Sequence, residues 1–193
     1  MAYTVNDFFR TAGSPASITT LPFRGLGGQP PFEPDDLDRF LRAPRIANLA
    51  YVRKDGRTNQ APLWYGYDEG VVHFTMEANS AKHRALVRDP RVTVTVQDER
   101  PPYRAVIIDG TVTIDDLGDD TAPSMSLAER YFGKVAAAKY RSMYEDVRKD
   151  AGMVRVTLHP DEVKGFDNTN AVDPVTLAFV RVRNRLPVPR RWL

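Results

Sequence analysis

Four side chains that suit anion binding lie together at residues 80–84, where a predicted strand gives way to a predicted short helix: Ser80, Lys82, His83 and Arg84. The N-terminus of a helix favours an anion because its first N–H groups are free and because it is the positive end of the helix dipole. Ser80 and Lys82 add a hydroxyl and a positive charge, so the sequence predicts a phosphate-binding site. A purely structural alternative stays open, in which Asn79 or Ser80 caps the helix. In this alternative the cations of the helix form a solvated face: Lys82, Arg84 and Arg88.

The residues of other common catalytic sites are absent or too scattered. The three histidines, His73, His83 and His159, have no metal-ligand spacing and no acidic cluster beside them, so no metal site is expected. The chain has no cysteine, which excludes disulfides, a thiolate nucleophile and thiolate metal ligands. No G-x-S-x-G motif, P-loop or Rossmann glycine fingerprint follows a predicted strand. Acyl transfer, nucleotide hydrolysis and doubly wound dinucleotide binding therefore lack their signatures.

Length and charge narrow the class of protein further. A chain of 193 residues is predicted to form one domain, and no apolar run approaches the ~20 residues of a membrane helix. We therefore expect a soluble protein without a membrane partner, and the absence of cysteine, which is compatible with a reducing compartment, makes the cytoplasm the expected location. The net charge of +2 argues against a nucleic-acid partner. The C-terminal cations are expected to form a solvated or subunit-wrapping tail: Arg181, Arg183, Arg185, Arg190 and Arg191.

The elements that position these residues can be predicted from periodicity. A helical turn is expected at Asp7–Arg10, followed by an irregular arm over 14–31 that is rich in proline and glycine. A helix is expected over 34–43, where Leu37, Phe40 and Leu41 form a buried stripe. Turns at 55–56 and 68–70 then separate three apolar runs, which predicts two successive hairpins in a β-meander over 46–76.

The second half of the chain alternates in the same way. Strands are predicted at 92–97, 104–114 and 153–160. Between the last two, a capping box at Ser126–Glu129 and apolar residues at helical spacing predict one long amphipathic helix to about Lys149. Short antiparallel strands with accessory helices indicate a small closed or partly closed β-barrel.

Two runs resemble the FMN-binding split-barrel family related to pyridoxamine-phosphate oxidase: TNQAPLWYGYDEGVVHFTMEANSAKHRALVRDPRVTVTV and PPYRAVIIDGTVTI. The resemblance extends over Leu37–Phe166, and its elements occur in the family's order, from a D-G-R hairpin to a glycine-marked strand after Tyr-Arg. It implies a mainly β fold, an antiparallel split β-barrel of Greek-key type with accessory helices. The expected layout is a single domain over 1–193 with a core at about 37–166, an N-terminal arm at 1–36 and an extension at 167–193.

The resemblance also implies a bound flavin-type cofactor and residues around it. One strand is similar to that beside the isoalloxazine ring: Gln60, Ala61, Pro62, Leu63 and Trp64. Thr75 matches the residue near the ribityl chain and phosphate, and Ser80 and Lys82 match the phosphate-binding pair. Tyr103 and Arg104 match a segment that reaches the ring from the other subunit. The family implies a homodimer with two cofactor sites at the interface.

The chain departs from the vitamin-forming oxidases at three positions where they carry basic residues; here these positions hold Gln60, Tyr65 and Ala81. That oxidase activity is therefore not expected. Residues 81–92 are similar to members that use the deazaflavin coenzyme F-420, whose acidic tail suits an open, mildly basic groove. Such a groove is predicted from the residues after Lys82: His83, Arg84 and Arg88. The sequence favours F-420, with FMN as the close alternative.

The predicted function is that of an oxidoreductase which transfers hydride to or from a small organic substrate. Because the cofactor carries the redox chemistry, no side chain is assigned as catalytic. Two alternatives stay open. One is a non-enzymatic flavin- or haem-binding module. The other is a nucleic-acid-binding barrel that uses the C-terminal arginines, which the near-neutral net charge disfavours.

Overall fold

The computed structural model describes residues 16–26 and 32–185. Its strands are β1 (Phe23–Gly25), β2 (Ala47–Val52), β3 (Thr58–Leu63), β4 (Gly66–Asp68), β5 (Val71–Glu77), β6 (Arg91–Gln97), β7 (Arg104–Asp116) and β8 (Met153–Asp167). Its α-helices are α2 (Pro34–Arg42), α3 (Ala81–Arg88), α4 (Ala122–Phe132), α5 (Lys134–Ala137), α6 (Arg141–Ala151) and α7 (Pro174–Arg185). Short 3-10 turns occur at Ile18–Thr20, Ala138–Tyr140 and Thr169–Ala171.

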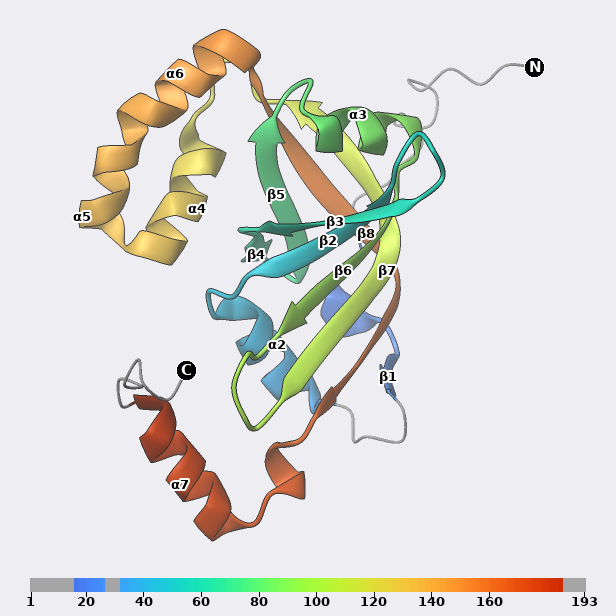
Figure 1. Cartoon of the computed structure of the whole chain (residues 1–193), viewed down its shortest axis with the longest axis vertical. Coiled ribbons are helices and arrows are strands. Elements are labelled where there is room, and N and C mark those ends of the chain that lie inside the picture. The colour runs from blue at the N-terminus through green and yellow to red at the C-terminus, as the bar shows by residue number, and fades with distance from the viewer. Residues whose placement is uncertain (1–15, 27–31, 186–193) are drawn as a thin grey trace.

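The strands form one curled sheet in the order β3-β2-β6-β7-β8-β5-β4 (Figure 1). All neighbours in this order are antiparallel, and β1 adds a parallel pairing with β8. Strand β7 pairs along its length with β8, and the curl of this pair gives the sheet the shape of a half-barrel (Figure 1). The predicted antiparallel split barrel with accessory helices is confirmed.

The predicted meander is wrong in one respect. Both hairpins form, β2 with β3 and β4 with β5, but they lie at opposite ends of the sheet. The chain leaves β3 after Leu63 because the next residues bond elsewhere. Tyr65 is fully buried, its N–H donates to the Tyr131 hydroxyl at 3.1 Å, and its own hydroxyl donates to the Leu41 carbonyl at 2.9 Å. Strand β5 then pairs with β8, a neighbour that its local sequence does not indicate.

Helices α2 and α3 form as predicted and close the core. Leu37, Phe40 and Leu41 of α2 are buried, and α3 buries Ala85 and Leu86. The inward positions of the sheet supply the rest of the core, including Leu49, Phe74, Val94, Ile108 and Leu158. No helix among the described residues is long and apolar enough to cross a membrane.

The predicted long helix over 126–149 is wrong, because the chain turns at Gly133. Helix α4 already begins at Ala122, so Ser126 lies inside it and caps nothing. Gly133 ends α4 with φ of 76°, a left-handed conformation that glycine adopts without steric cost. The chain returns through α5 into α6, and Tyr144 of α6 packs against a small cluster that includes Met125 and Ala128. The break creates a helical pair beside the sheet (Figure 1).

The last strand and the tail are also more regular than expected. Strand β8 continues beyond Pro160 because a register shift between Asp109 and Gly110 admits the proline. A Cβ on Gly110 would lie 2.2 Å from the His159 carbonyl oxygen, so this position requires glycine. Part of the predicted tail forms helix α7, whereas Arg190 and Arg191 lie outside the described residues, as do Asp7–Arg10 and parts of the arm.

Candidate functional site

A cavity of about 540 Å³ lies between the end of β3, β5, the start of α3 and the α4–α6 pair. Its walls come from segments more than 60 residues apart in the sequence, which the curl of the sheet brings together. Six of the ten predicted site residues line it: Pro62, Leu63, Trp64, Thr75, Ser80 and Lys82. The structure therefore brings the last three residues of the predicted ring-side strand and the predicted phosphate-binding pair to one place.

The helix start at this cavity combines a cap with free donors. Ser80 is the N-cap, and its Oγ accepts from the His83 N–H at 3.2 Å. The His83 ring in turn accepts at Nδ1 from the N–H of Asn79, which has a left-handed φ of 60°. The structural alternative of a Ser80 cap is thus confirmed, but it does not exclude an anion. The Ser80 hydroxyl proton and the first-turn N–H groups of Ala81 and Lys82 have no intrahelical acceptors.

The cations of α3 have different environments. Arg84 donates to the carbonyl oxygen of Asn79, and Arg88 donates to that of Val52 at 2.7 Å. Lys82 is half-buried at the cavity wall, and no carboxylate of the described residues lies within ion-pair distance of it. One acidic residue, Glu77, also lines the cavity, where its side chain is exposed. The local positive charge therefore comes from Lys82 and the helix start.

An aromatic cluster supports the cavity wall at Trp64. The Trp64 ring stacks on Tyr131 with 5.1 Å between centroids and meets Phe132 edge to face at 4.8 Å. The Tyr131 hydroxyl donates to the Arg45 carbonyl oxygen at 2.5 Å. Burial raises the pKa of Tyr131, and burial likewise raises the pKa of Tyr65 to about 12. Both hydroxyls therefore stay protonated at neutral pH and hold the wall by hydrogen bonds.

The family model for pyridoxamine 5'-phosphate oxidase matches residues 34–166, more than two thirds of the chain. The chain belongs to this family. The matched range contains the cavity and the strands from β2 to the end of β8 except its last residue, and it excludes α7. Membership of the pyridoxamine 5'-phosphate oxidase family confirms the predicted resemblance.

Solved structures share the fold. A conserved hypothetical protein from Mycobacterium tuberculosis is 20% identical, with 86% of this chain and 98% of that chain covered and a TM-score of 0.61. An F420 reductase is 25% identical, with 65% and 94% covered and a TM-score of 0.51. The haem storage protein HutZ from Vibrio cholerae is 12% identical, with 67% and 91% covered and a TM-score of 0.51. No curated protein matches the sequence.

Several residues that line the cavity were not among the site residues predicted from the sequence. The α4–α6 pair contributes Leu127, Met143, Tyr144 and Val147. Three of these, Leu127, Met143 and Val147, belong to the apolar stripe that helical spacing indicates. The spacing identifies the stripe but does not show that it faces a cavity, because the chain reversal at Gly133 decides its direction.

The other four predicted site residues lie away from this cavity. Gln60 and Ala61 are on β3, where Gln60 is exposed. Tyr103 is 52% exposed, and Arg104 lines a second cleft, where its Nε donates to Asp98 at 2.7 Å. The family resemblance assigned Tyr103 and Arg104 to the other subunit's cofactor, and this assignment stays a prediction.

Proposed function

We propose that this chain is an oxidoreductase that binds a flavin-type cofactor in the cavity, with F-420 favoured over FMN. The observation that carries the proposal is the division of one cavity wall into a polar and an apolar part. Ser80 and Lys82, which can donate to a phosphate, lie in the polar part with Thr75 and Glu77, and apolar and aromatic residues form the other part. A tricyclic ring with a phosphate on its side chain has the same division into apolar and anionic parts.

The residues present fit such a cofactor. The Ser80 hydroxyl, the Lys82 ammonium and the first-turn N–H groups of α3 would hold the phosphate. Thr75 offers a further hydroxyl on β5. Apolar surface for the ring comes from Leu63, Trp64, Leu127 and Val147.

The bound cofactor would supply the hydride chemistry. The side chains of the cavity would bind and orient it and exclude water from its ring. The Trp64–Tyr131 stack and the hydrogen bonds of Tyr131 keep this wall in place. A small organic substrate is proposed as the hydride partner.

Two observations favour F-420. One of the similar solved structures, at 25% identity and a TM-score of 0.51, is an F420 reductase. In addition, Lys82 lines the cavity together with the carboxylate Glu77, whereas a terminal FMN dianion is best held by several converging cations. A phosphodiester, as in the deazaflavin, carries less charge at this point. The basic groove predicted from His83, Arg84 and Arg88 does not support this choice, because none of these residues lines the cavity. Arg84 and Arg88 donate to backbone carbonyls instead.

The test is titration of the cofactor-free protein with F-420 and with FMN, followed by ring fluorescence. Saturable F-420 binding that is tighter than FMN binding supports the proposal. Tight FMN binding without F-420 binding would overturn the choice of cofactor. If the bound cofactor exchanges no hydride with nicotinamide donors or with candidate organic acceptors, the protein is a binding module and the proposed enzymatic role is wrong.

A further inference from the structure

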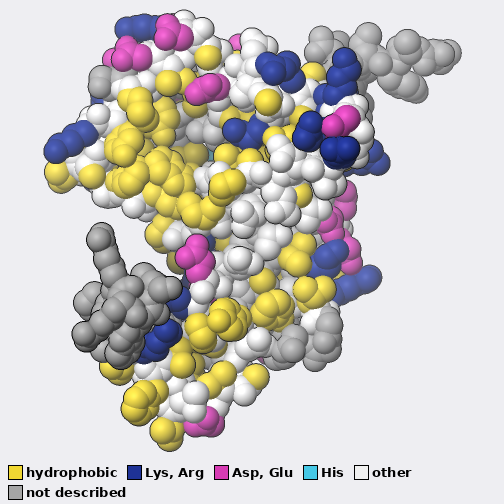
Figure 2. Space-filling model, viewed as in Figure 1, with side chains coloured by type: hydrophobic (Ala, Val, Ile, Leu, Met, Phe, Trp, Pro, Cys, Tyr) yellow, Lys and Arg dark blue, Asp and Glu magenta, His cyan; other side chains and the backbone are white. Residues whose placement is uncertain are grey.

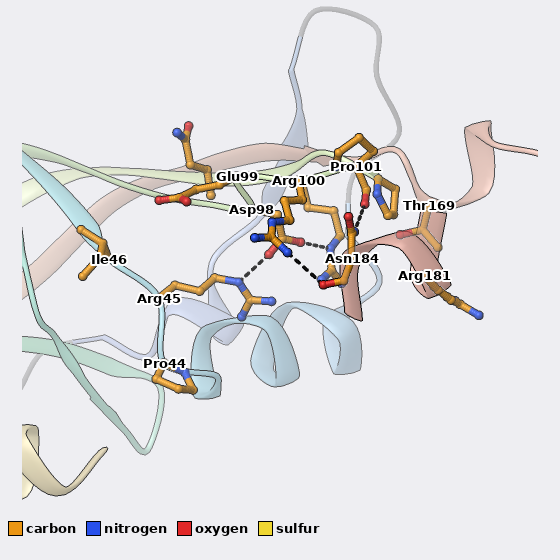
Figure 3. Close-up of a pocket in the computed structure, with 13 residues that line it drawn as sticks. Pro44, Arg45, Ile46, Asp98, Glu99, Arg100, Pro101, Thr169, Arg181 and Asn184 are labelled. Carbon is orange, nitrogen blue, oxygen red and sulfur yellow. Dashed lines mark hydrogen bonds and ion pairs between the residues drawn. The ribbon is translucent and has the colours of Figure 1, made fainter. Parts of the chain in front are cut away.

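A second cleft, of about 640 Å³, lies outside the cofactor cavity (Figure 3). It forms where the α2–β2 junction, the β6–β7 loop and α7 meet. Thr169, Arg181 and Asn184 of its lining follow residue 166, so this part of the cleft is an addition to the region shared with the family. Ile46 lines both hollows, which places the cleft next to the cofactor cavity.

The centre of the cleft holds more positive than negative charge. The Asp98 carboxylate forms ion pairs with two guanidinium groups, with Arg45 Nε at 2.8 Å and with Arg104 Nε at 2.7 Å. The side chains of Arg45, Arg104 and Asp98 are only 17%, 27% and 20% exposed, respectively. Both guanidiniums also lie over the Phe40 ring, at 3.9 and 5.0 Å. One carboxylate between two guanidiniums leaves a positive charge uncompensated where little water reaches it, which is costly without an anion.

Two further arginines increase this excess. Arg100 donates from Nη1 to the Asn184 carbonyl oxygen at 2.9 Å, and Asn184 Nδ2 donates to the Pro101 carbonyl oxygen at 2.8 Å (Figure 3). These bonds fix the loop to α7, while Arg181 extends from α7 at the edge of the cleft (Figure 3). Within the described part of the chain, no carboxylate forms an ion pair with Arg100 or Arg181. Four arginines and two carboxylates, Asp98 and Glu99, line the cleft, an excess of two positive charges.

The lining favours carboxylates over phosphates. Phosphate sites in proteins commonly use several backbone N–H groups, whereas Pro44, Pro101 and Pro102 of this lining have none. Asp98 and Glu99 repel a dianionic group more than a singly charged one. Guanidiniums bind carboxylates and phosphates equally well in geometry, so the preference rests on the scarcity of N–H donors and on the charge of Asp98 and Glu99. Two singly charged groups would balance the excess charge of the cleft.

We propose that this arginine cleft is a binding site for a small organic dicarboxylate. One carboxylate lies against Arg45 Nη2 and the Nη groups of Arg104, because Arg45 Nη1 already donates to the Phe40 carbonyl oxygen. The second carboxylate lies towards Arg100. None of its four arginines lines the cofactor cavity of the same chain. In the homodimer that the family resemblance implies, Arg104 would also reach the cofactor of the second copy, so Arg100→Gln is the variant that separates the two proposals.

The experiment is calorimetric titration of the full chain with glutarate, with glutaramide and inorganic phosphate as comparison ligands. We expect saturable glutarate binding, with glutaramide inactive and phosphate weaker. Arg104→Gln should weaken glutarate binding by about tenfold or more, since it removes one charge-assisted contact. Arg57→Gln removes the same charge from the exposed β2–β3 hairpin and should leave the affinity within about twofold.

Arg104 also pairs with Asp98, so Arg104→Gln could prevent folding. A second variant keeps the test decisive in that case. Arg100→Gln leaves the Asp98 pairs intact and should also weaken glutarate binding severalfold. The proposal is overturned if glutarate gives no saturable binding, if phosphate binds more tightly, or if Arg57→Gln weakens binding as much as Arg100→Gln. Failure of cofactor binding would not affect these results, so the two proposals fail separately.

Discussion

At the residue scale, substitution of Lys82 tests whether its side chain contacts the cofactor or supports the fold. The side chain is half-buried at the cavity wall on the first turn of α3, so Lys82→Ala should change the free energy of unfolding by less than about 0.5 kcal/mol. Loss of a charge-assisted phosphate contact should weaken cofactor binding by about 1.5–3 kcal/mol. Fluorescence titration and urea unfolding measure the two effects. Lys54→Ala, on the exposed hairpin, is the control, and equal cofactor affinity in both variants would contradict the phosphate site.

The buried His73 should make the free energy of unfolding depend on pH. The residue is 4% exposed, and burial, helped by the charge of Arg155, lowers the pKa of His73 to about 4. Asp68, 3.7 Å from its Nε2, acts in the opposite direction, and Arg130 in the same direction as Arg155. The unfolded chain, with a pKa near 6.5, binds the proton more readily than the folded chain does. The free energy of unfolding should therefore fall as pH decreases from about 6.5 to about 4, by up to about 3 kcal/mol.

The contribution of His73 is isolated by His73→Leu. His73 Nδ1 has no hydrogen-bond partner, so an apolar replacement leaves no acceptor or donor unpaired at this atom. Burial also lowers the pKa of His159, and that residue is unchanged in the variant. Urea unfolding between pH 4 and 7 should show a shallower pH dependence for His73→Leu than for the natural chain. Identical slopes would mean that His73 does not titrate in this range.

At the scale of elements, the short β4–β5 hairpin depends on a glycine. Gly66 lies directly opposite His73, and a Cβ at position 66 would lie 2.1 Å from His73 Nε2. Gly66→Ala should therefore destabilise the fold by about 1–3 kcal/mol, the usual cost of overpacking. In a double-mutant cycle, His73→Ala should remove most of this penalty because it vacates the space. Additive effects in the cycle would contradict the proposed clash.

The Tyr131 hydroxyl joins helix α4 to the segments that precede β2 and β4. Tyr131 accepts from the Tyr65 N–H at 3.1 Å and donates to the Arg45 carbonyl oxygen. Tyr131→Phe keeps the stack on Trp64 but leaves two part-buried backbone groups unpaired, at a cost of about 1–3 kcal/mol. Tyr140→Phe, whose ring stacks on Phe132, is the matched control. Thermal unfolding should show a clear loss for Tyr131→Phe alone; equal midpoints would refute this role.

At the scale of the whole molecule, we propose a homodimer with the cofactor sites at its interface. Tyr103 and Arg104 lie away from the cavity of their own chain, as expected if they reach the site of a second copy. Large hydrophobic side chains are exposed, with Val135 at 87% and Phe179 at 77%, and hydrophobic side chains gather over the α4–α6 pair (Figure 2). Sedimentation velocity should give twice the chain mass. A monomer that binds cofactor tightly would contradict the dimer.

The sequence by itself determined those features that depend on local interactions. The turns at Gly56 and Gly70, with φ of 80° and 82°, form the two hairpins because glycine adopts these conformations readily. The stripe of Leu37, Phe40 and Leu41 fixed α2 in the same way. Ser80 begins α3 as a cap, and residues on either side of it reach the cavity. The order of these local motifs was enough to identify the family.

The tertiary structure alone decided which distant segments meet. Local periodicity describes a strand's faces but not its neighbours, so the separation of the two hairpins to opposite ends of the sheet was not predictable from it. The reversal at Gly133 turned an expected long helix into a pair whose apolar side lines the cavity. The arginine cleft joins Arg45, Asp98, Arg104 and Asn184, which no motif connects. Their proximity results from the curl of the sheet and the docking of α7, which are long-range contacts that single-sequence patterns do not encode.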